Sequence, residues 1–371
     1  MKYSALLKPI TGSYTLQDCQ FLLTEIEPNY VDVAEKEVLI QSGAKHYSEM
    51  ISFEHPPSET YRALFHDLTE QYKARLASEI LGIAEQVLKV RTGPLTIVSL
   101  ARAGTPFGAL LNRAFSEVFN VETVHYSISI IRDRGIDQNA LKYILRDQLR
   151  PASGVFFVDT WTAKGVITGE LKRAIQKWNQ TEPEQLSDQL FVISDIGGTA
   201  DFAATYDDYA IPSGVMNATV SGLMSRSILN ETIHPDQFHG SVYYKHLENH
   251  DQSAWFLDEV SQLFSQVKPS STPITNRERR RELSQQWINR WLEEFQIKDI
   301  NHIKPGVAEA TRVMLRRIPA YLILKDLDDQ DVAHLRWLAT EKSVPLILRP
   351  KMPFKAVAFI KALQLDQSSI T

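Results

Sequence analysis

Hydrophobic residues recur at three- and four-residue spacing over a long stretch near the start of the chain. From Tyr61 to Val87 they fall on one side of a predicted helix. Gly93 and Pro94 follow soon after, and this pair predicts the end of the helix. The pattern then changes to short continuous apolar runs, which are typical of strands buried on both faces.

Four such runs alternate with helical patterns. The predicted strands cover 95–100, 122–131, 154–159 and 189–194, and the predicted helices cover 106–119, 139–148 and 165–178. This alternation favours an α/β fold, a parallel sheet with helices on both faces. Because right-handed crossovers bring the strand-to-helix loops to one edge of such a sheet, we expect ligands to bind at that edge.

The rest of the chain divides at a stretch rich in Ser, Pro and Thr. Residues 196–260 are irregular and fit short strands or a cap over the sheet edge. We place a linker at 266–284, between a domain at 1–265 with an N-terminal extension and a hood, and a module at 285–371. In this small α/β module we predict helices at 306–317, 329–341 and 353–363 and strands at 321–324 and 345–348.

The composition changes this picture little. The chain has 371 residues, of which 43% are hydrophobic and 23% charged, and this excludes disordered, collagen-like and coiled-coil proteins. Cys19 is the only cysteine, so no internal disulfide forms. We find neither an apolar run long enough for a membrane span nor a secretory signal. We therefore expect a cytoplasmic protein with no membrane contact, and a homodimer stays open.

Charge is distributed unevenly along the chain. Residues 276–371 carry 17 Lys and Arg against 12 Asp and Glu, whereas residues 1–275 carry 23 against 33. A basic tail on an acidic body suggests an anionic partner at the C-terminal end, or merely an unevenly charged surface.

A tight turn of small residues follows the first predicted strand. Its residues Arg102, Ala103 and Gly104 precede Pro106, which suits the first turn of a helix. Backbone N–H groups at such a turn can bind an anion, and Arg102 adds a bidentate phosphate donor. Taken alone, the loop also fits an ordinary structural turn.

A second loop combines a carboxylate with hydroxyls, glycines and a lysine. Asp159 ends a predicted buried strand, where it can hold ribose hydroxyls or a Mg²⁺ ion carried by a polyphosphate. The Thr and Gly residues that follow can surround a phosphate, and Lys164 supplies positive charge. Alternatively, Asp159 caps the next helix and Lys164 is solvated.

Two further segments contain candidate binding residues. Arg132, Asp133, Arg134 and Asp137 fit either a mobile loop that closes on a phosphate or a surface turn held by ion pairs. Ser221, Ser225 and Arg226 could form a hood over a base or another acceptor. Equally, these serines could satisfy the backbone of a turn-rich segment.

Together these loops resemble the type I phosphoribosyltransferase fold. The resemblance implies that Asp159 is catalytic and holds the ribose of phosphoribosyl pyrophosphate (PRPP), with Mg²⁺ arriving on PRPP and not held by protein ligands alone. It implies a pyrophosphate site at Arg102, Ala103 and Gly104 and a ribose-phosphate site at Thr160, Thr162, Ala163, Lys164, Gly165 and Thr168. The chain departs from this pattern at Thr160, where a second acid is usual, and at Trp161 and Lys164, where small residues are usual.

A closer resemblance covers nearly the whole chain. SLARAGTPFG, HYSISIIRDRGID, FVDTWTAKGVITGEL, DDYAIPSGVMNATVSGLMSRSIL and FHGSVYYKHL look like a bacterial phosphoribosyltransferase-like family found near tellurium-resistance and stress-response genes, also called StiP. Its members are similar in ending with a Pelota-type RNA-binding domain, which residues 305–312 and 321–326 fit. The resemblance thus implies RNA as a possible partner, with Gly306, Arg312 and Arg316 as candidate contacts.

The resemblance implies glycosyl transfer that makes or modifies a nucleoside-like compound in a stress response, with PRPP or a nucleotide as ligand. Two alternatives stay open. The first is a non-catalytic regulator that senses a nucleotide and binds RNA. The second is a cysteine protease, as the StiP label suggests, with Cys19 as the only candidate thiol nucleophile. Nothing in the sequence places a histidine beside Cys19, which we expect in an amphipathic helix.

Overall fold

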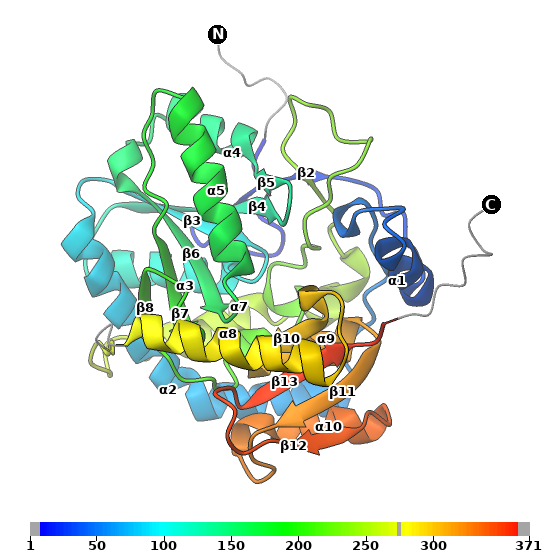
Figure 1. Cartoon of the computed structure of the whole chain (residues 1–371). Coiled ribbons are helices and arrows are strands. Elements are labelled where there is room, and N and C mark those ends of the chain that lie inside the picture. Colours follow the sequence, from blue (N-terminus) through cyan, green and yellow to red (C-terminus); the bar gives the residue numbers. More distant parts are fainter. Residues whose placement is uncertain (1–7, 273–275, 363–371) are drawn as a thin grey trace.

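The predicted strands form the centre of a parallel sheet. In the computed structural model, which describes residues 8–272 and 276–362, the strand order is β1-β4-β3-β6-β7-β8 (Figure 1). All neighbours along this order are parallel, and β5 pairs antiparallel with β4. The strands are β1 (Gln20–Leu22), β3 (Leu95–Ala101), β4 (Thr123–Ile131), β5 (Gly135–Ile136), β6 (Val155–Thr162), β7 (Leu190–Asp195) and β8 (Phe202–Thr205).

Helices cover both faces of this sheet, as its continuous apolar strands require. One face packs against α2 (Glu59–Val90), α3 (Thr105–Glu117) and α7 (Ser253–Ser261), and the other against α4 (Gln138–Lys142) and α5 (Val166–Thr181). The predicted long helix is α2, whose first turn is capped by the Ser58 hydroxyl. No helix within the described residues is long and apolar enough to cross a bilayer.

Few regular elements lie outside these layers. They are α1 (Val33–Gln41), the short α6 (Pro212–Val215) and the pair β2 (Thr24–Glu25) and β9 (Gly240–Ser241). The irregular course from 196 to 252 agrees with the turn residues of that segment.

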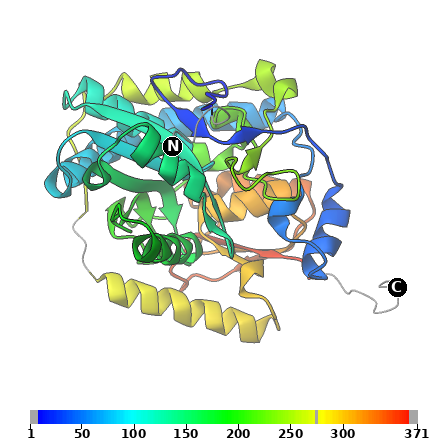
Figure 2. The ribbon, with the colours of Figure 1, turned by 90° about the horizontal axis from the view of Figure 1, so that it is seen from above.

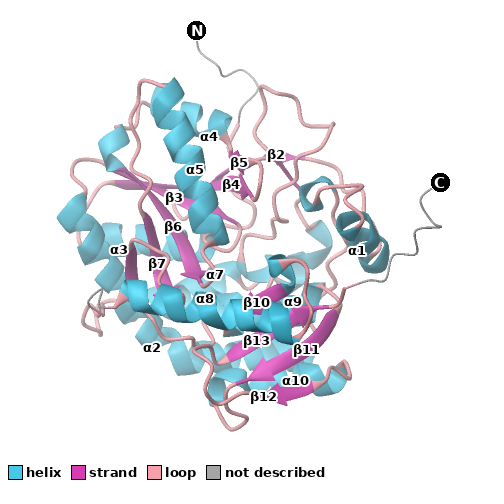
Figure 3. Cartoon of the chain, viewed as in Figure 1, coloured by secondary structure: helices cyan, strands magenta, loops and turns pink. Residues whose placement is uncertain are grey.

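The C-terminal domain is a small α/β unit (Figure 3). Its sheet has the order β10-β13-β11-β12, with α8 on one face and α9 and α10 on the other. The elements are α8 (Arg277–Glu294), β10 (Ile303–Pro305), α9 (Val307–Arg316), β11 (Pro319–Leu324), α10 (Ala333–Glu341), β12 (Leu346–Leu348) and β13 (Ala356–Ile360).

Two expectations for this part of the chain differ from the structure. The helix predicted over 353–363 is wrong, because Ala356–Ile360 is the strand β13, buried along its whole length between β10 and β11. A five-residue apolar run cannot distinguish a buried strand from a helix. In addition, α8 begins at Arg277, inside the expected linker 266–284, of which residues 273–275 lie outside the described part.

The two domains share one hydrophobic core. Figures 1 and 2 show the C-terminal domain (orange to red) against the body of the protein. Tyr61 of α2 stacks on Trp337 of α10 at 6.0 Å between ring centroids. The buried Asp208 carboxylate accepts hydrogen bonds from the backbone N–H groups of Val307 and Lys355, both at 2.8 Å. These contacts fix the C-terminal domain over the carboxyl ends of the central strands.

Candidate functional site

Two cavities lie between the domains. The smaller, of about 410 Å³, is bounded by the loop from β6 to α5 and by α9. The larger, of about 510 Å³, is bounded by the segment 51–58, α9 and α10. Three basic residues, Lys36, Arg226 and Arg316, line both cavities. We call the two cavities together the interdomain cleft.

The loops after β3 and β6 meet at this cleft, as parallel neighbours should. The hydroxyl of Thr160 donates to the carbonyl of Ala103 at 2.7 Å, and Ala103 and Asp159 both line the smaller cavity. The strand β6 is longer than predicted and ends at Thr162, so Asp159 and Thr160 lie within it. Gly104 precedes α3 and packs against β6, leaving no room for a side chain.

Arg102 and Lys164 line different cavities of the cleft. The Arg102 guanidinium donates to the Glu54 carboxylate at 2.9 Å and to the Met224 carbonyl at 2.7 Å, and it lines the larger cavity. The Lys164 ammonium donates to the Ile300 carbonyl at 2.7 Å and lines only the smaller cavity. The pyrophosphate site at Arg102 and the ribose-phosphate site at Lys164 stay predictions.

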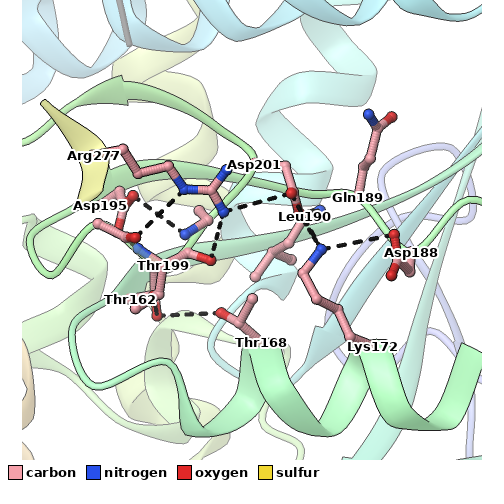
Figure 4. A network of polar contacts seen from close by, with 12 residues as sticks. Thr162, Thr168, Lys172, Asp188, Gln189, Leu190, Asp195, Thr199, Asp201 and Arg277 are labelled. Carbon is pink, nitrogen blue, oxygen red and sulfur yellow. Dashed lines mark hydrogen bonds and ion pairs between the residues drawn. The ribbon is translucent and has the colours of Figure 1, made fainter. Parts of the chain in front are cut away.

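The threonines of the β6–α5 loop bond to each other and to the next loop (Figure 4). The Thr162 hydroxyl lies 2.8 Å from that of Thr199 and 3.4 Å from that of Thr168. Arg277, the first residue of α8, donates to the Thr199 carbonyl at 3.2 Å. Gly165 packs its backbone against Thr199 with a positive φ, and Ala163 is buried. The loop is thus fastened to α8.

Among the described residues, Asp159 has no cationic partner at bonding distance. One oxygen accepts from the backbone N–H of Thr160 at 2.8 Å. Burial raises the pKa of Asp159 to about 7, and the Thr160 N–H and the charge of Arg312 offset only part of this effect. At neutral pH, both the protonated and the ionised form of the Asp159 carboxyl are therefore populated.

We expect Asp159→Asn to stabilise the protein at pH 8 by about 1–2 kcal/mol. When folding raises the pKa of a carboxyl group, the protein loses stability as the pH rises from the group's pKa in the unfolded chain, near 4, to its pKa in the folded protein. The gain should therefore shrink toward pH 5, and melting temperatures at both pH values measure it. Asp133→Asn, at an exposed side chain, should show no such pH dependence. Destabilisation by Asp159→Asn at pH 8 would contradict the expectation.

The predicted mobile loop is held by defined contacts. Arg134 pairs with Glu49, and Arg132 pairs with Asp133 at 2.9 Å and lies over the Tyr47 ring. Asp137 is buried and caps α4, accepting from the backbone N–H groups of residues 139 and 140. Of these residues only Arg132 lines the cleft.

Of the predicted hood residues, the two serines bond to the local backbone and only the arginine lines the cleft. The hydroxyls of Ser221 and Ser225 are buried and donate to backbone carbonyls of residues 217 and 226, so they satisfy the local chain. The Arg226 guanidinium bonds to the Met50 carbonyl and lines both cavities.

The three candidate RNA contacts are turned toward the first domain. Gly306 starts α9, but the N-terminus of that helix is capped by the Asp208 carboxylate. Arg312 lies 4.5 Å above the ring of Trp161, and Arg316 lines the cleft. The inward face of α9 is therefore part of the cleft and not a free surface.

Sequence reasoning missed several charged residues at the cleft, among them Lys36, Lys304, Glu309 and Arg317. Arg317 pairs with the buried Glu37 of α1, and Lys304 and Arg312 lower the pKa of Glu309 against the opposing effect of burial. The basic character of residues 276–371 hinted at Lys304 and Arg317, whereas nothing in the sequence hinted at Lys36. In the described residues, no group of three or more His, Cys, Asp or Glu side chains could hold a metal ion. Mg²⁺ carried by a ligand stays a prediction.

Cys19 lies in the loop before β1, not in a helix, and has a histidine close by. Gln20 and Tyr126 are partners in the parallel ladder of β1 and β4, so the residues before them, Cys19 and His125, are neighbours. Nδ1 of His125 lies 2.7 Å from the Asp18 carbonyl, and Nε2 lies 2.7 Å from the Ser99 hydroxyl. Cys19 is 1% exposed. Burial, and next the charge of Asp18, raise the pKa of its thiol well above the usual value.

Comparison with known proteins matches most of the chain. Residues 12–261 match the family described as "Tellurite-like stress resistance cysteine protease StiP", and residues 282–362 match the "PELOTA RNA binding domain". Over 369 residues the chain is 40% identical to "Cysteine protease StiP" of Acinetobacter baylyi (strain ATCC 33305 / BD413 / ADP1). This alignment covers 95% of this chain and 94% of that protein. The sequence-based resemblance to both families is confirmed.

Solved structures give only a distant likeness. The hypoxanthine phosphoribosyltransferase of Trypanosoma cruzi is 17% identical, with a TM-score of 0.28, and the match covers 36% of this chain and 77% of that one. The same enzyme in complex with the product IMP gives 17% identity, a TM-score of 0.27 and coverage of 37% and 75%. These scores carry no conclusion, so the type I fold stays a prediction beyond the parallel α/β sheet.

The comparisons correct the predicted activity. The family description and the relative that spans nearly the whole chain both name a cysteine protease, and neither names a phosphoribosyltransferase. The prediction of glycosyl transfer from PRPP is therefore wrong. The alternative that we kept beside it, a cysteine protease, agrees better with these findings.

Proposed function

Since this chain belongs to the StiP family, whose description names a cysteine protease, we propose that it is a cysteine-dependent protease with Cys19 as nucleophile. Cys19 is the only cysteine in the sequence, so no other side chain can supply a thiolate. The observation that supports this proposal is the position of Cys19 beside His125 on the adjacent strand.

The two side chains have the chemical capacities that the reaction needs. Because Nδ1 of His125 faces a carbonyl oxygen, that nitrogen carries the proton, and Nε2 accepts the hydroxyl proton of Ser99. In catalysis, the His125 ring must leave these two hydrogen bonds so that one of its nitrogens takes the proton of the thiol, and the thiolate attacks the carbonyl carbon of a peptide bond. The C–N bond breaks as the imidazolium protonates the leaving amine, and water then hydrolyses the thioester to a carboxylic acid and the free thiol.

In the conformation of the structure, Cys19 and His125 are not arranged for catalysis. The thiol has almost no contact with solvent, and burial lowers the pKa of His125 to about 4, which makes the ring a weak base. Catalysis therefore requires that Cys19 become exposed. The strand β1 is three residues long and lies at the end of the sheet order, which is where local opening costs least. We propose that displacement of β1 activates the enzyme.

The proposal is tested with the full chain and a peptide library derived from a bacterial proteome. We expect a loss of cleavage of more than about 100-fold in Cys19→Ala, because no other thiol can replace the nucleophile. Alkylation of Cys19 by iodoacetamide should be slow and should accelerate in Phe21→Ala, which weakens β1.

Ile97→Val is the matched control, because it removes one methylene group from the same core without touching the thiol. It should keep activity near that of the wild type. Cleavage by Cys19→Ala at the wild-type rate, or no Cys19-dependent cleavage of any library peptide, would overturn the proposal.

The match of residues 282–362 to a Pelota RNA-binding domain supports RNA as a partner of this protein. The basic residues of α9 that we predicted as contacts lie in the cleft, so a strand of RNA would have to reach them there or bind another face of the domain. RNA is therefore one arm of the binding experiment described below.

A further inference from the structure

We propose that the interdomain cleft binds a small molecule bearing a phosphate group or a similar dianionic oxyanion, with Lys36, Arg226 and Arg316 as its cationic ligands. The three side chains come from α1, from the segment after η4 (Ala218–Val220) and from α9, and each of them lines both cavities. The site thus needs both domains. It is separate from the Cys19–His125 pair, neither of which lines a cavity of the cleft.

None of the three cations forms an ion pair with any residue in the described ranges. The Lys36 ammonium bonds to the Ser52 hydroxyl at 2.7 Å, and Arg226 bonds to the Met50 carbonyl. Arg316 makes no hydrogen bond to the described residues, and its Nε and Nη2 atoms are buried. Nη1 of Arg226 is also buried without a partner. Since burying a cation without a partner is unfavourable, these groups favour an anion as the ligand of the cleft.

Three carboxylates near the basic residues already have a cationic partner. Glu37 pairs with Arg317, Glu54 pairs with Arg102 at 2.9 Å, and Glu309 pairs with Arg312 at 3.2 Å. Asp159, Asp299 and Glu341 line the cleft without a cationic partner among the described residues, and burial raises the pKa of Asp159 to about 7. Lys and Arg side chains nevertheless outnumber Asp and Glu side chains in the lining of the two cavities. The centre of the cleft therefore keeps excess positive charge.

The basic groups also destabilise one another. Burial, and next the charges of Arg226 and Arg317, lower the pKa of Lys36 to about 8. Burial and the charge of Arg102 lower the pKa of Arg316, and the charge of Glu54 offsets only part of this effect. A bound dianion would reverse these effects, and the planar guanidinium groups suit the oxygens of a phosphate.

Size and lining favour a small ligand over a polymer. Cavities of 410 and 510 Å³ fall in the range of small-molecule sites, roughly 300–1,000 Å³. Tyr61, Tyr244 and Trp337 line the larger cavity and offer apolar surface for the organic part of a phosphate ester. Free phosphate and a phosphate ester share the charged group, and the test separates them.

The test uses the full chain at constant ionic strength with three probes: inorganic phosphate, phenyl phosphate and a single-stranded RNA oligomer. Binding is measured by calorimetric titration and by the shift in melting temperature. We expect both phosphates to raise the wild-type melting temperature, and binding to weaken at least 10-fold in Arg316→Gln and Arg226→Gln. Tighter binding of phenyl phosphate identifies an ester as the ligand, and equal binding identifies free phosphate.

Stability without ligand provides a second readout. Because Arg316→Gln removes an unpaired buried charge, it should melt at or above the wild-type temperature, so lost binding cannot be attributed to unfolding. The matched control is Arg290→Gln on α8, where the side chain is 65% exposed, and it should bind like the wild type.

Three results would overturn the proposal. One is the absence of phosphate binding to the wild type, and another is an equal loss of binding in Arg290→Gln. The third is RNA binding that is lost in Arg316→Gln but is not displaced by phenyl phosphate, which would assign the cleft to RNA.

Discussion

Replacing Asp208 with alanine is expected to divide a single unfolding transition into two. Its carboxylate accepts the backbone N–H groups of Val307 and Lys355, and the residue is 5% exposed. Alanine would leave both donors buried and unpaired, at a cost of about 1–3 kcal/mol each. Because these bonds join the domains, the loss falls on the contact between them, and the C-terminal domain should melt first. Differential scanning calorimetry of the full chain measures this.

The neighbouring residue provides a control. Asp207 is 43% exposed and pairs with Arg75 at 2.9 Å, an ion pair at the surface that contributes about 1 kcal/mol or less. Asp207→Ala should therefore melt in one transition close to that of the wild type. If Asp208→Ala also melts in one unshifted transition, the carboxylate does not hold the domains together.

Replacing Trp291 with alanine should destabilise the C-terminal domain by about 3–5 kcal/mol, because a fully buried aromatic side chain is removed and a cavity is left. The Trp291 ring is 0% exposed and lies 6.1 Å from the rings of both Phe354 and Phe359. It is the main contact of α8 with the C-terminal sheet. Urea unfolding followed by circular dichroism gives the free energy of unfolding.

Trp287 lies one turn earlier on the same helix and is only partly buried. Trp287→Ala removes a side chain of the same size, so it should cost clearly less than Trp291→Ala. Equal losses in the two variants would contradict the view that burial against the sheet, and not helix stability, sets the effect.

The sequence could predict the order of elements where a pattern was long. The spacing from Tyr61 to Val87 gave α2, and the apolar runs gave the parallel strands, because both patterns follow from local geometry. Predictions from short apolar runs were less reliable. Ala356–Ile360 forms a strand because it pairs with β10 and β11, which are distant in the sequence. Strand ends were also misplaced, so that Asp159 lies inside β6.

The site was harder to predict because its contacts join distant segments. Ala103 and Thr160 meet because their strands are neighbours, which the alternation of strands and helices indicated. The partner of Arg102, however, is Glu54 from an irregular segment, and the cap of α9 is Asp208 from the other domain. The neighbour of Cys19 is His125, and this depends on the order of the strands in the sheet. No local pattern contains that information.

The shared core also has a consequence for synthesis on the ribosome. Tyr61 and Tyr72 of α2 contact Trp337 and Asp331, which are translated about 260–275 residues later. At a translation rate of about 5–20 residues per second, the side of α2 that contacts Trp337 and Asp331 lacks these partners for roughly 13–55 seconds after it is synthesised. During that interval the nascent chain displays an apolar surface, so a chaperone that shields it should raise the yield of folded protein.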